Sequence, residues 1–257
     1  MLRGILLSLI VRVSLLVSIF LLFTVNLQAD QNRDHVVCRE NLSQNDRNEL
    51  SSKLRQITGL SDLSFDGAGV LRLGTKEPVG GSEHARKLLT KVISGPTIVI
   101  LEDASKSDVV FSRVIPGIWK RGGSDTPPIF VMQIDFADFD HVMGDVRALQ
   151  AFDVGWAVLH EFDHIVNDSR DATGLDQAGE CEDHINQMRR ECGLPQRADY
   201  FFTLSPLSQN TAFTTRLVRL AFDQEKSPTG KKRRYWIVWD AKLVGGLDEK
   251  KEIAVLR

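Results

Sequence analysis

The apolar residues of the chain recur first with the period of helices. Residues 47 to 58 and residues 82 to 93 both carry apolar side chains three and four positions apart, which predicts two amphipathic helices. Residues 63 to 73, between them, have the composition of a strand that Gly67 and Gly69 interrupt.

Three short apolar runs rich in β-branched residues follow at residues 97 to 101, 109 to 115 and 129 to 136. A polar turn separates the first two runs, so we expect these two strands to pair with each other. Pro127 and Pro128 precede the third run. Such a proline pair fits the start of a strand or an edge strand but not a central position.

The second half of the chain returns to helices and closes with strands. We expect a loop or irregular turn at residues 137 to 144, a buried helix at residues 152 to 166 and another helix at residues 178 to 192. Two strand-like runs, residues 211 to 222 and 234 to 244, are joined by a polar loop and indicate a hairpin. These elements together predict one α+β domain.

The N-terminus has the organisation of an export signal. A basic start with Arg3 and Arg12 precedes an apolar run at residues 13 to 27, and Ala29 offers a small residue for cleavage. In the alternative, residues 5 to 27 form one membrane-spanning helix that tethers the protein, but Arg12 would then lie in the bilayer at a high cost. Both interpretations place the folded part beyond the cytoplasmic membrane.

This interpretation divides the chain into a signal peptide or membrane anchor at residues 1 to 29, a flexible polar spacer at residues 30 to 46, and a folded domain at residues 47 to 257. The composition is that of a globular protein, with 42% hydrophobic and 26% charged residues. The net charge of -2 becomes -4 without the first segment, because 30 of the 32 basic residues and all 34 acidic residues then remain. This balance argues against nucleic acid as the main partner.

Three cysteines do not make a disulfide framework. Cys181 and Cys192 are eleven positions apart in one predicted helix, which separates them by about 16 Å along its axis, too far for a disulfide. Two alternatives stay open for Cys38: a disulfide with either of the other two, or a free thiol while the others are small buried residues.

The segment His160-Glu161-Phe162-Asp163-His164 carries the strongest chemical signal. On a helix the two histidines lie about 40° apart around the axis and about 6 Å apart along it, so both imidazoles can bind one ion. Glu161 then lies beside the ion, where it can take a proton from an activated water. In the alternative, the histidines only form hydrogen bonds within the core; the apolar surroundings argue against it, because unbonded polar groups are costly to bury.

The stretch from Ala157 to Val166 resembles the zincin metallopeptidases at nearly every position. It departs from them at Asp163, where members usually have an uncharged residue; on a helix Asp163 projects from the flank opposite Glu161. The resemblance implies a mixed sheet with the motif helix below it and an edge strand that lines the cleft. Residues 129 to 136 are the natural candidate for that strand.

Zinc needs a third protein ligand, with the fourth position left for water. No histidine follows at the short spacing of metzincins, but Glu180, Glu182, Asp183 and His184 lie at the distance of the gluzincin glutamate. In helical projection Glu182 and His184 flank the buried stripe, whereas Asp183 points outward. Glu182 is favoured further, because residues 182 to 200 resemble the segment after the zinc motif in poorly characterised bacterial, effector-type zinc metallopeptidases.

The same resemblance implies that Asn186 orients a zinc histidine through a hydrogen bond. A hydrolase also needs a donor for the oxyanion that develops on its substrate, and Tyr200 is the first choice ahead of His184 and Arg189. The alternative for Tyr200 is a ring packed on a sheet with its hydroxyl in water.

Other polar groups favour ordinary roles. His35 falls in the predicted spacer, where we expect it to be solvated. Asp135, Asp138 and Asp140 could hold a cation, although acidic residues in a turn are more often solvated. The basic run at residues 231 to 234 falls at the predicted hairpin turn, where a solvated loop tip is expected before a contact with anionic lipid or a partner.

The sequence therefore predicts a zinc-dependent hydrolase, in its favoured form a metallopeptidase that cleaves a peptide or protein substrate in the periplasm or outside the cell. Zn²⁺ would be bound by His160, His164 and Glu182, with Glu161 as general base and Tyr200 as oxyanion donor. One alternative is a zinc-binding but non-catalytic interaction module of the cell envelope. The other is a protein in which the histidines are structural and no metal binds.

Overall fold

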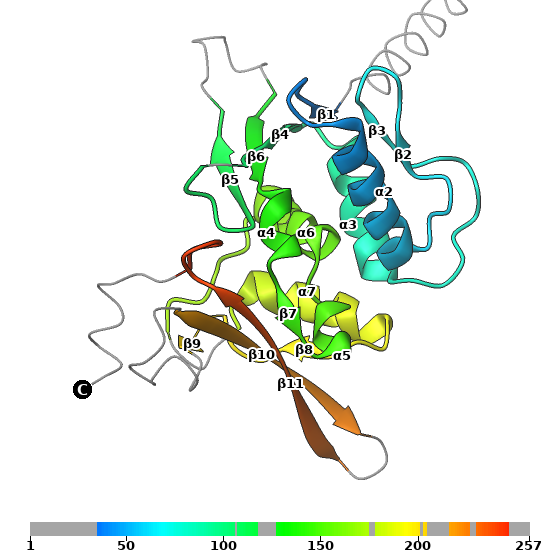
Figure 1. Ribbon diagram of the computed structural model, residues 1–257. Helices are drawn as coiled ribbons and strands as arrows, with labels where there is room; N and C mark the ends of the chain where they lie inside the picture. Colours follow the sequence, from blue (N-terminus) through cyan, green and yellow to red (C-terminus); the bar gives the residue numbers. More distant parts are fainter. Residues whose placement is uncertain are drawn as a thin grey trace, which may run out of the picture. The chain divides into compact units, whose positions relative to one another are not determined.

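A four-stranded sheet forms one layer of the domain (Figure 1). In spatial order its strands are β1 (Val36–Cys38), β4 (Ile98–Asp103), β6 (Ile129–Ile134) and β5 (Ser112–Pro116). The first three strands run parallel, whereas β5 runs antiparallel to β6 and forms an edge of the sheet among the described residues.

The computed structural model describes residues 35–105, 107–117, 127–174, 178–200, 203–204, 216–226 and 230–246. All of them belong to one compact unit, His35–Arg257. The predicted signal peptide or membrane anchor lies outside the described residues. Within the described ranges, every helix is too short or too polar to cross a membrane.

Three long helices pack against one another and share a core with the four-stranded sheet. They are α2 (Gln44–Thr58), α3 (Glu83–Ser94) and α6 (Val154–Asn167). The side chains of Ser43, Ser82 and Asp153 accept hydrogen bonds from backbone N–H groups in the first turn of each helix, which satisfies donors that a helix leaves unpaired. α6 also packs against β5 and β6, and its Leu159 and Phe162 are fully buried.

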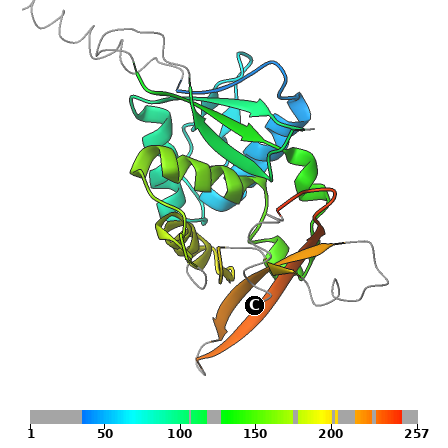
Figure 2. The same cartoon turned by 90° about the vertical axis from the view of Figure 1, so that its left-hand side faces the viewer.

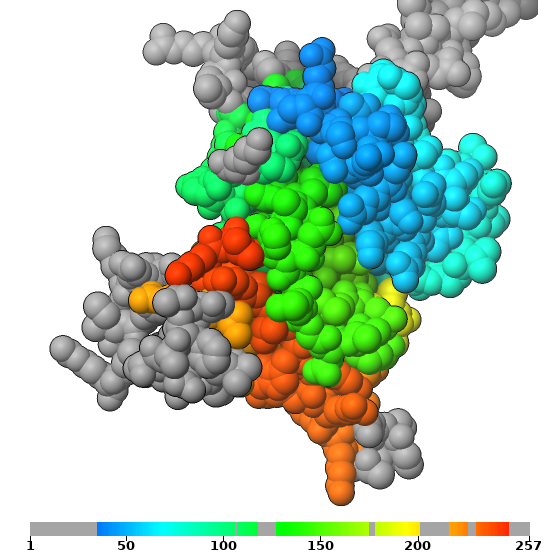
Figure 3. Space-filling view, viewed as in Figure 1, coloured from blue at the N-terminus to red at the C-terminus, as the bar shows by residue number. Residues whose placement is uncertain are grey.

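A second, antiparallel sheet forms around the C-terminal hairpin. Its strands are β7 (Met143–Gly144), β11 (Lys231–Asp240), β10 (Leu217–Lys226) and β8 (Gln196–Arg197), and β9 (Thr203–Leu204) also pairs with β10. In Figures 1 and 2 the four-stranded sheet and this hairpin lie on opposite sides of α6, and in Figure 3 the far end of the hairpin projects from the body. Phe222, Ile237 and Trp239 build a second apolar core beneath it.

Short elements connect these layers. They are the two-stranded sheet of β2 (Ser64–Phe65) and β3 (Leu71–Arg72), the helices α4 (Phe136–Asp140) and α5 (Val146–Leu149), and the longer helix α7 (Glu180–Glu191). α7 packs against α3 and α6 and places Cys181, Ile185 and Met188 in the first core.

Phe111 joins the two cores just before β5. Its φ of 64° is unusual for a bulky residue, so the surroundings must hold it there. Its ring lies 4.9 Å from that of Phe152 and 5.3 Å from that of Trp239. Its N–H donates to Asp138 Oδ2 at 2.9 Å, and its carbonyl accepts from Asp135 N at 2.9 Å. Ring and main chain are both fixed, and they set where β5 begins.

Much of the predicted organisation is confirmed. The domain is α+β, the four predicted helices form as α2, α3, α6 and α7 within a few residues of their predicted bounds, and the two C-terminal runs pair as a hairpin. The interrupted strand at residues 63 to 73 is the β2–β3 pair, with a turn at Asp66 and Gly69. Residues 231 to 234 at the hairpin are exposed, as expected.

Two strand predictions were wrong. β4 and β5 do not pair with each other, because β6 lies between them. β6 is therefore a central strand, and the edge strand is β5 instead of residues 129 to 136. The prolines permit this arrangement because they precede the strand, where Pro128 contributes only its carbonyl, an acceptor for Ile98 N at 2.7 Å.

The predicted spacer and the predicted loop also contain regular structure. Residues 36–38 form β1, Leu42 is fully buried, and only 7% of the surface of His35 is exposed, so the folded region includes the second part of the predicted spacer. Segments this short show no periodicity in a sequence. Within residues 137 to 144, α4 forms with Asp135 as its N-cap. The three cysteines are free.

The buried carboxyl of Asp138 makes stability depend on pH. Burial raises its pKa from 3.8 to about 6, against the hydrogen bond from Phe111. A raised acid pKa means that the folded state binds more protons between these values, so stability falls as pH rises through them. We expect the stability of the wild type relative to Asp138→Asn to fall by about 2 to 3 kcal/mol between pH 3 and pH 7. Urea unfolding of both proteins measures this, and a pH-independent difference would contradict it.

Candidate metal centre

The two motif histidines converge on the same side of α6. They lie one helical turn apart, and their rings are nearly perpendicular, with centroids 4.8 Å apart. Nε2 of His160 is 3.2 Å from Nε2 of His164. The helix thus brings one nitrogen of each ring to a common point, as the four-residue spacing predicts.

Asp171 adds a carboxylate oxygen to this pair. α6 ends at Asn167, and Asp168 then adopts a left-handed conformation with φ of 52°, which turns the chain back toward the helix. Oδ1 of Asp171 lies 3.1 Å from Nε2 of His160 and 3.3 Å from Nε2 of His164. The three atoms form a nearly equilateral triangle.

The triangle has the dimensions of one face of a tetrahedral zinc site. Zinc bonds of about 2.0 to 2.1 Å to nitrogen and oxygen require ligand atoms about 3.3 Å apart. The observed separations of 3.1, 3.2 and 3.3 Å agree with this value. Burial opposes a charge on His160, but the hydrogen bonds to Asp171, Cys181 and Glu182 outweigh it and raise its pKa.

Asp163 fixes the turn that carries Asp171. Only 1% of its surface is exposed, and its carboxylate accepts hydrogen bonds from Asn167 Nδ2 at 2.6 Å and Ser169 Oγ at 2.6 Å. The carbonyl of Ser169 lies 2.8 Å from Nδ1 of His164 and is placed to accept its proton. This residue, at which the chain departs from the zincin pattern, thus stabilises the loop beside the site.

Glu182 lies behind His160 and outside the triangle. Its Oε2 is 3.4 Å from Nδ1 of His160, the ring nitrogen that points away from Asp171. The carboxylate pairs with Arg189, and with Arg197 at 3.1 Å. Burial alone would raise the pKa of Glu182, but the two guanidinium groups outweigh it and lower the pKa. A carboxylate in this position orients a metal-binding histidine without touching the metal.

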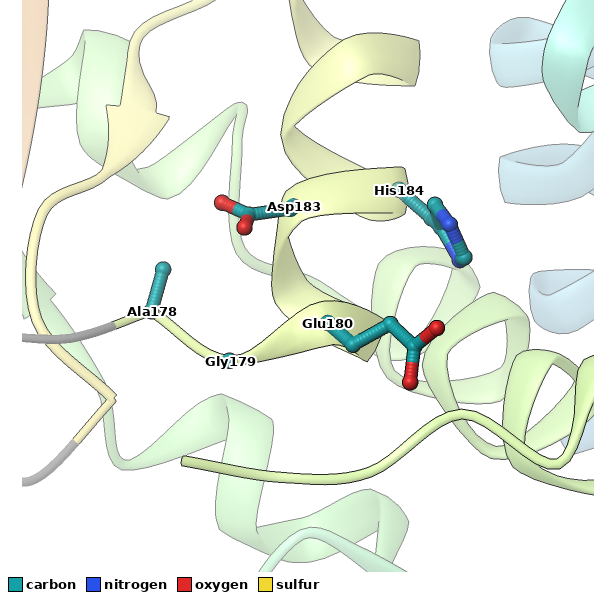
Figure 4. Close-up of a pocket in the computed structure, with 5 residues that line it drawn as sticks. All are labelled: Ala178, Gly179, Glu180, Asp183 and His184. Carbon is teal, nitrogen blue, oxygen red and sulfur yellow. The ribbon is translucent and has the colours of Figure 1, made fainter. Parts of the chain in front are cut away.

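The other three candidates for a third ligand diverge at the start of α7. Figure 4 shows Asp183 pointing to one side of the helix and Glu180 and His184 to the other, at a pocket they line together with Ala178 and Gly179. Nδ1 of His184 lies 2.8 Å from Asp163 Oδ2. The described residues with ligand atoms that converge are His160, His164, Asp171 and Cys181.

Glu161 faces β5 from the motif helix. Only 7% of its surface is exposed, and its Oε1 accepts a hydrogen bond from Ser112 Oγ at 3.0 Å. Burial raises the pKa of Glu161, and the neighbouring histidines oppose this. Because Ser112 follows Phe111 directly, the aromatic contacts of Phe111 help to position the hydroxyl that holds Glu161.

Tyr200 lies over the same group of side chains. Its ring stacks on that of His160 with centroids 6.3 Å apart, and its hydroxyl hydrogen-bonds with Asp171. Burial and this carboxylate raise the pKa of Tyr200, so the hydroxyl keeps its proton. The guanidinium carbon of Arg197 also lies over the Tyr200 ring, 5.0 Å from the ring centroid.

The structure also shows the surroundings of Asn186 and of the acidic residues in and beside α4. Asn186 does not approach a histidine in any hydrogen bond that the described residues form; it pairs with the main chain of Arg197 and with Arg189. Of the acidic residues expected to be solvated, Asp140 is exposed, but Asp135 and Asp138 are buried and accept main-chain hydrogen bonds in and beside α4.

The sequence interpretation missed Asp171, Ser112 and the contact of Cys181 with the histidines. Asp171 lies seven positions after His164, where a search restricted to the established ligand spacings does not find it. Ser112 is distant in sequence and reaches Glu161 only through the sheet topology.

Comparisons with protein-family models, with curated proteins and with solved structures give no match for this chain.

Replacement of Asp171 tests the triangle directly. Asp171→Ala should weaken zinc binding at least about 100-fold, because the loss of a ligand should exceed the 10- to 100-fold effect of losing an outer partner. Asp183→Ala, an exposed carboxylate on α7, is the matched control and should bind zinc as the wild type does. Competition with a chelating dye measures both affinities. Unchanged affinity in Asp171→Ala would contradict the triangle.

Replacement of Gly179 offers a second test, in which no candidate ligand residue is mutated. Its φ is 87°, and a Cβ there would lie 2.4 Å from Ala172 N and 2.9 Å from Asp171 C. Gly179→Ala should therefore displace the Asp171 turn and weaken zinc binding about tenfold or more. Gly193→Ala is the control, because Gly193 has φ of 66° but a Cβ meets nothing within 4 Å. Equal zinc affinities in the two variants would contradict the role of this turn.

Proposed function

We propose that this protein is a zinc-dependent hydrolase whose metal is held by His160, His164 and Asp171. The observation that carries the proposal is the triangle of ligand atoms with sides of 3.1 to 3.3 Å, beside the buried carboxylate of Glu161. The donor set of two imidazoles and one carboxylate matches catalytic zinc sites, which keep three protein ligands and one open position.

The neighbouring groups support hydrolysis. Bound zinc would supply a Lewis acid that polarises a carbonyl group and lowers the pKa of a water molecule. Glu161 takes the proton from that water and later gives it to the leaving amine; its raised pKa makes it a stronger proton acceptor. Ser112 holds the carboxylate through Oε1, and the protonated hydroxyl of Tyr200 is the donor proposed for the oxyanion.

The surroundings favour a peptide as the substrate. β5 is an edge strand among the described residues, and it packs against the motif helix. An extended peptide can add to such an edge through main-chain hydrogen bonds, which would lay a peptide bond beside Glu161. A mixed sheet with the HExxH helix below it and an edge strand beside the helix is also the arrangement that the zincin resemblance implies. The proposed protein is therefore still a metallopeptidase of the zincin type, but its third zinc ligand is Asp171 instead of Glu182.

Removal of the general base tests catalysis. Glu161→Gln should keep one zinc ion per chain but lose about 10²- to 10⁴-fold in hydrolysis of a fluorescently labelled denatured protein. Glu180→Gln, an exposed glutamate on α7, should keep both zinc and activity. Undiminished hydrolysis by Glu161→Gln would remove Glu161 from the mechanism.

The alternative is a zinc-binding interaction module of the cell envelope without catalysis. It predicts that zinc-loaded wild type shows no hydrolysis and that Glu161→Gln keeps the biological role. Zinc well below one ion per chain after metal-replete purification would exclude both proposals. The exported location stays a proposal that depends on the N-terminal segment.

A further inference from the structure

Cys181 lies against the candidate metal centre, and the proposed reaction does not use it. The residue is fully buried in the first turn of α7. Its Sγ donates to the carbonyl of His160 at 3.3 Å, and the sulfur lies within 4.8 Å of a ring nitrogen of both His160 and His164. An ordinary buried cysteine packs among apolar side chains as a small hydrophobe. This one donates to the main chain of a motif histidine and lies beside the ring nitrogens of the centre.

The backbone places Cys181 and Asp171 together. Asp171 and Gly179 form an antiparallel bridge, and the N–H of Cys181 donates to the carbonyl of Arg170 at 3.2 Å. The turn that carries the carboxylate and the turn that carries the thiol are therefore held as one unit. A displacement of one of them moves the other.

We propose that Cys181 is a fourth protein donor to the same ion, so that two nitrogens, one oxygen and one sulfur surround it. This inference rests on the metal centre of the proposed function. Its sulfur lies within 4.8 Å of the ligand atoms of His160, His164 and Asp171. In a tetrahedral site with zinc bonds of about 2.3 Å to sulfur and about 2.0 to 2.1 Å to nitrogen, these atoms lie about 3.6 Å apart. A shift of about 1 Å then completes the coordination.

A sulfur donor has two consequences for the centre. A soft thiolate selects zinc over magnesium, calcium and manganese, which prefer oxygen ligands. Cys181 would occupy the fourth position, which a catalytic site leaves to water, so the water that Glu161 serves would bind there when the thiolate leaves it. Cys181 thus determines the metal selectivity of the centre, and Glu161 acts as the base for the water.

The absorption spectrum of the cobalt-loaded full chain tests this proposal without an activity assay. A thiolate ligand gives Co²⁺ an intense near-ultraviolet charge-transfer band that nitrogen and oxygen ligands alone do not give. Wild type should show the band with one ion bound. Cys181→Ser should bind cobalt without the band and should bind zinc about 10- to 100-fold more weakly.

Cys192→Ser is the matched control, since Cys192 lies at the other end of α7 and its Sγ donates to the carbonyl of Ile57. It should keep the band and the zinc affinity. Wild type that binds cobalt without the band, or Cys181→Ser that retains it, overturns the sulfur donor but leaves the three-ligand centre standing. Wild type that binds neither cobalt nor zinc overturns the proposed function as well. The wild-type spectrum decides the question even if a variant does not fold.

Discussion

The buried carboxylate of Asp163 is the interaction on which the candidate site depends. A carboxylate inside a protein is costly unless donors surround it, and here a hydroxyl, an amide and an imidazole nitrogen lie within 2.6 to 2.8 Å. These partners come from the end of α6, the following turn and α7. One side chain on the motif helix therefore sets the positions of both segments that approach its histidines. The turn then carries Asp171, and α7 carries Cys181 and Glu182.

The two imidazoles are held in the same way, although by different partners. In each ring one nitrogen faces the triangle and the other faces a fixed acceptor: Ser169 O for His164 and Glu182 for His160. An acceptor at Nδ1 fixes the proton there and leaves Nε2 with its lone pair toward the shared point. Glu182 can serve as this acceptor because Arg189 and Arg197 balance its buried charge. The ion pairs of α7 therefore support a function of α6.

The parts of this structure that depend on local spacing could be predicted from the sequence. The long helices follow from apolar periodicity and caps, and His160, Glu161 and His164 follow from the geometry of one helical turn. Asp171 could not be predicted in this way, because it depends on a left-handed residue at Asp168 and a turn without periodicity. Helical projection placed both Glu182 and His184 on the flanks of the buried stripe, but Glu182 is 1% exposed whereas His184 is exposed. Projection gives a face of a helix and not the atom that the face contacts.

The positions of β5 and Ser112 depend on the topology of the four-stranded sheet. Because β6 lies between β4 and β5, the strand nearest in sequence to β4 becomes the edge strand next to α6, and Ser112 comes to face Glu161. The conformation of Phe111 that leads into β5 is held by rings of the second core. The triangle, in contrast, is built wholly from residues 160 to 171 and braced by α7. The triangle and the placement of Glu161 therefore depend on different cores, so a change in the aromatic cluster can displace Glu161 while it leaves the triangle intact.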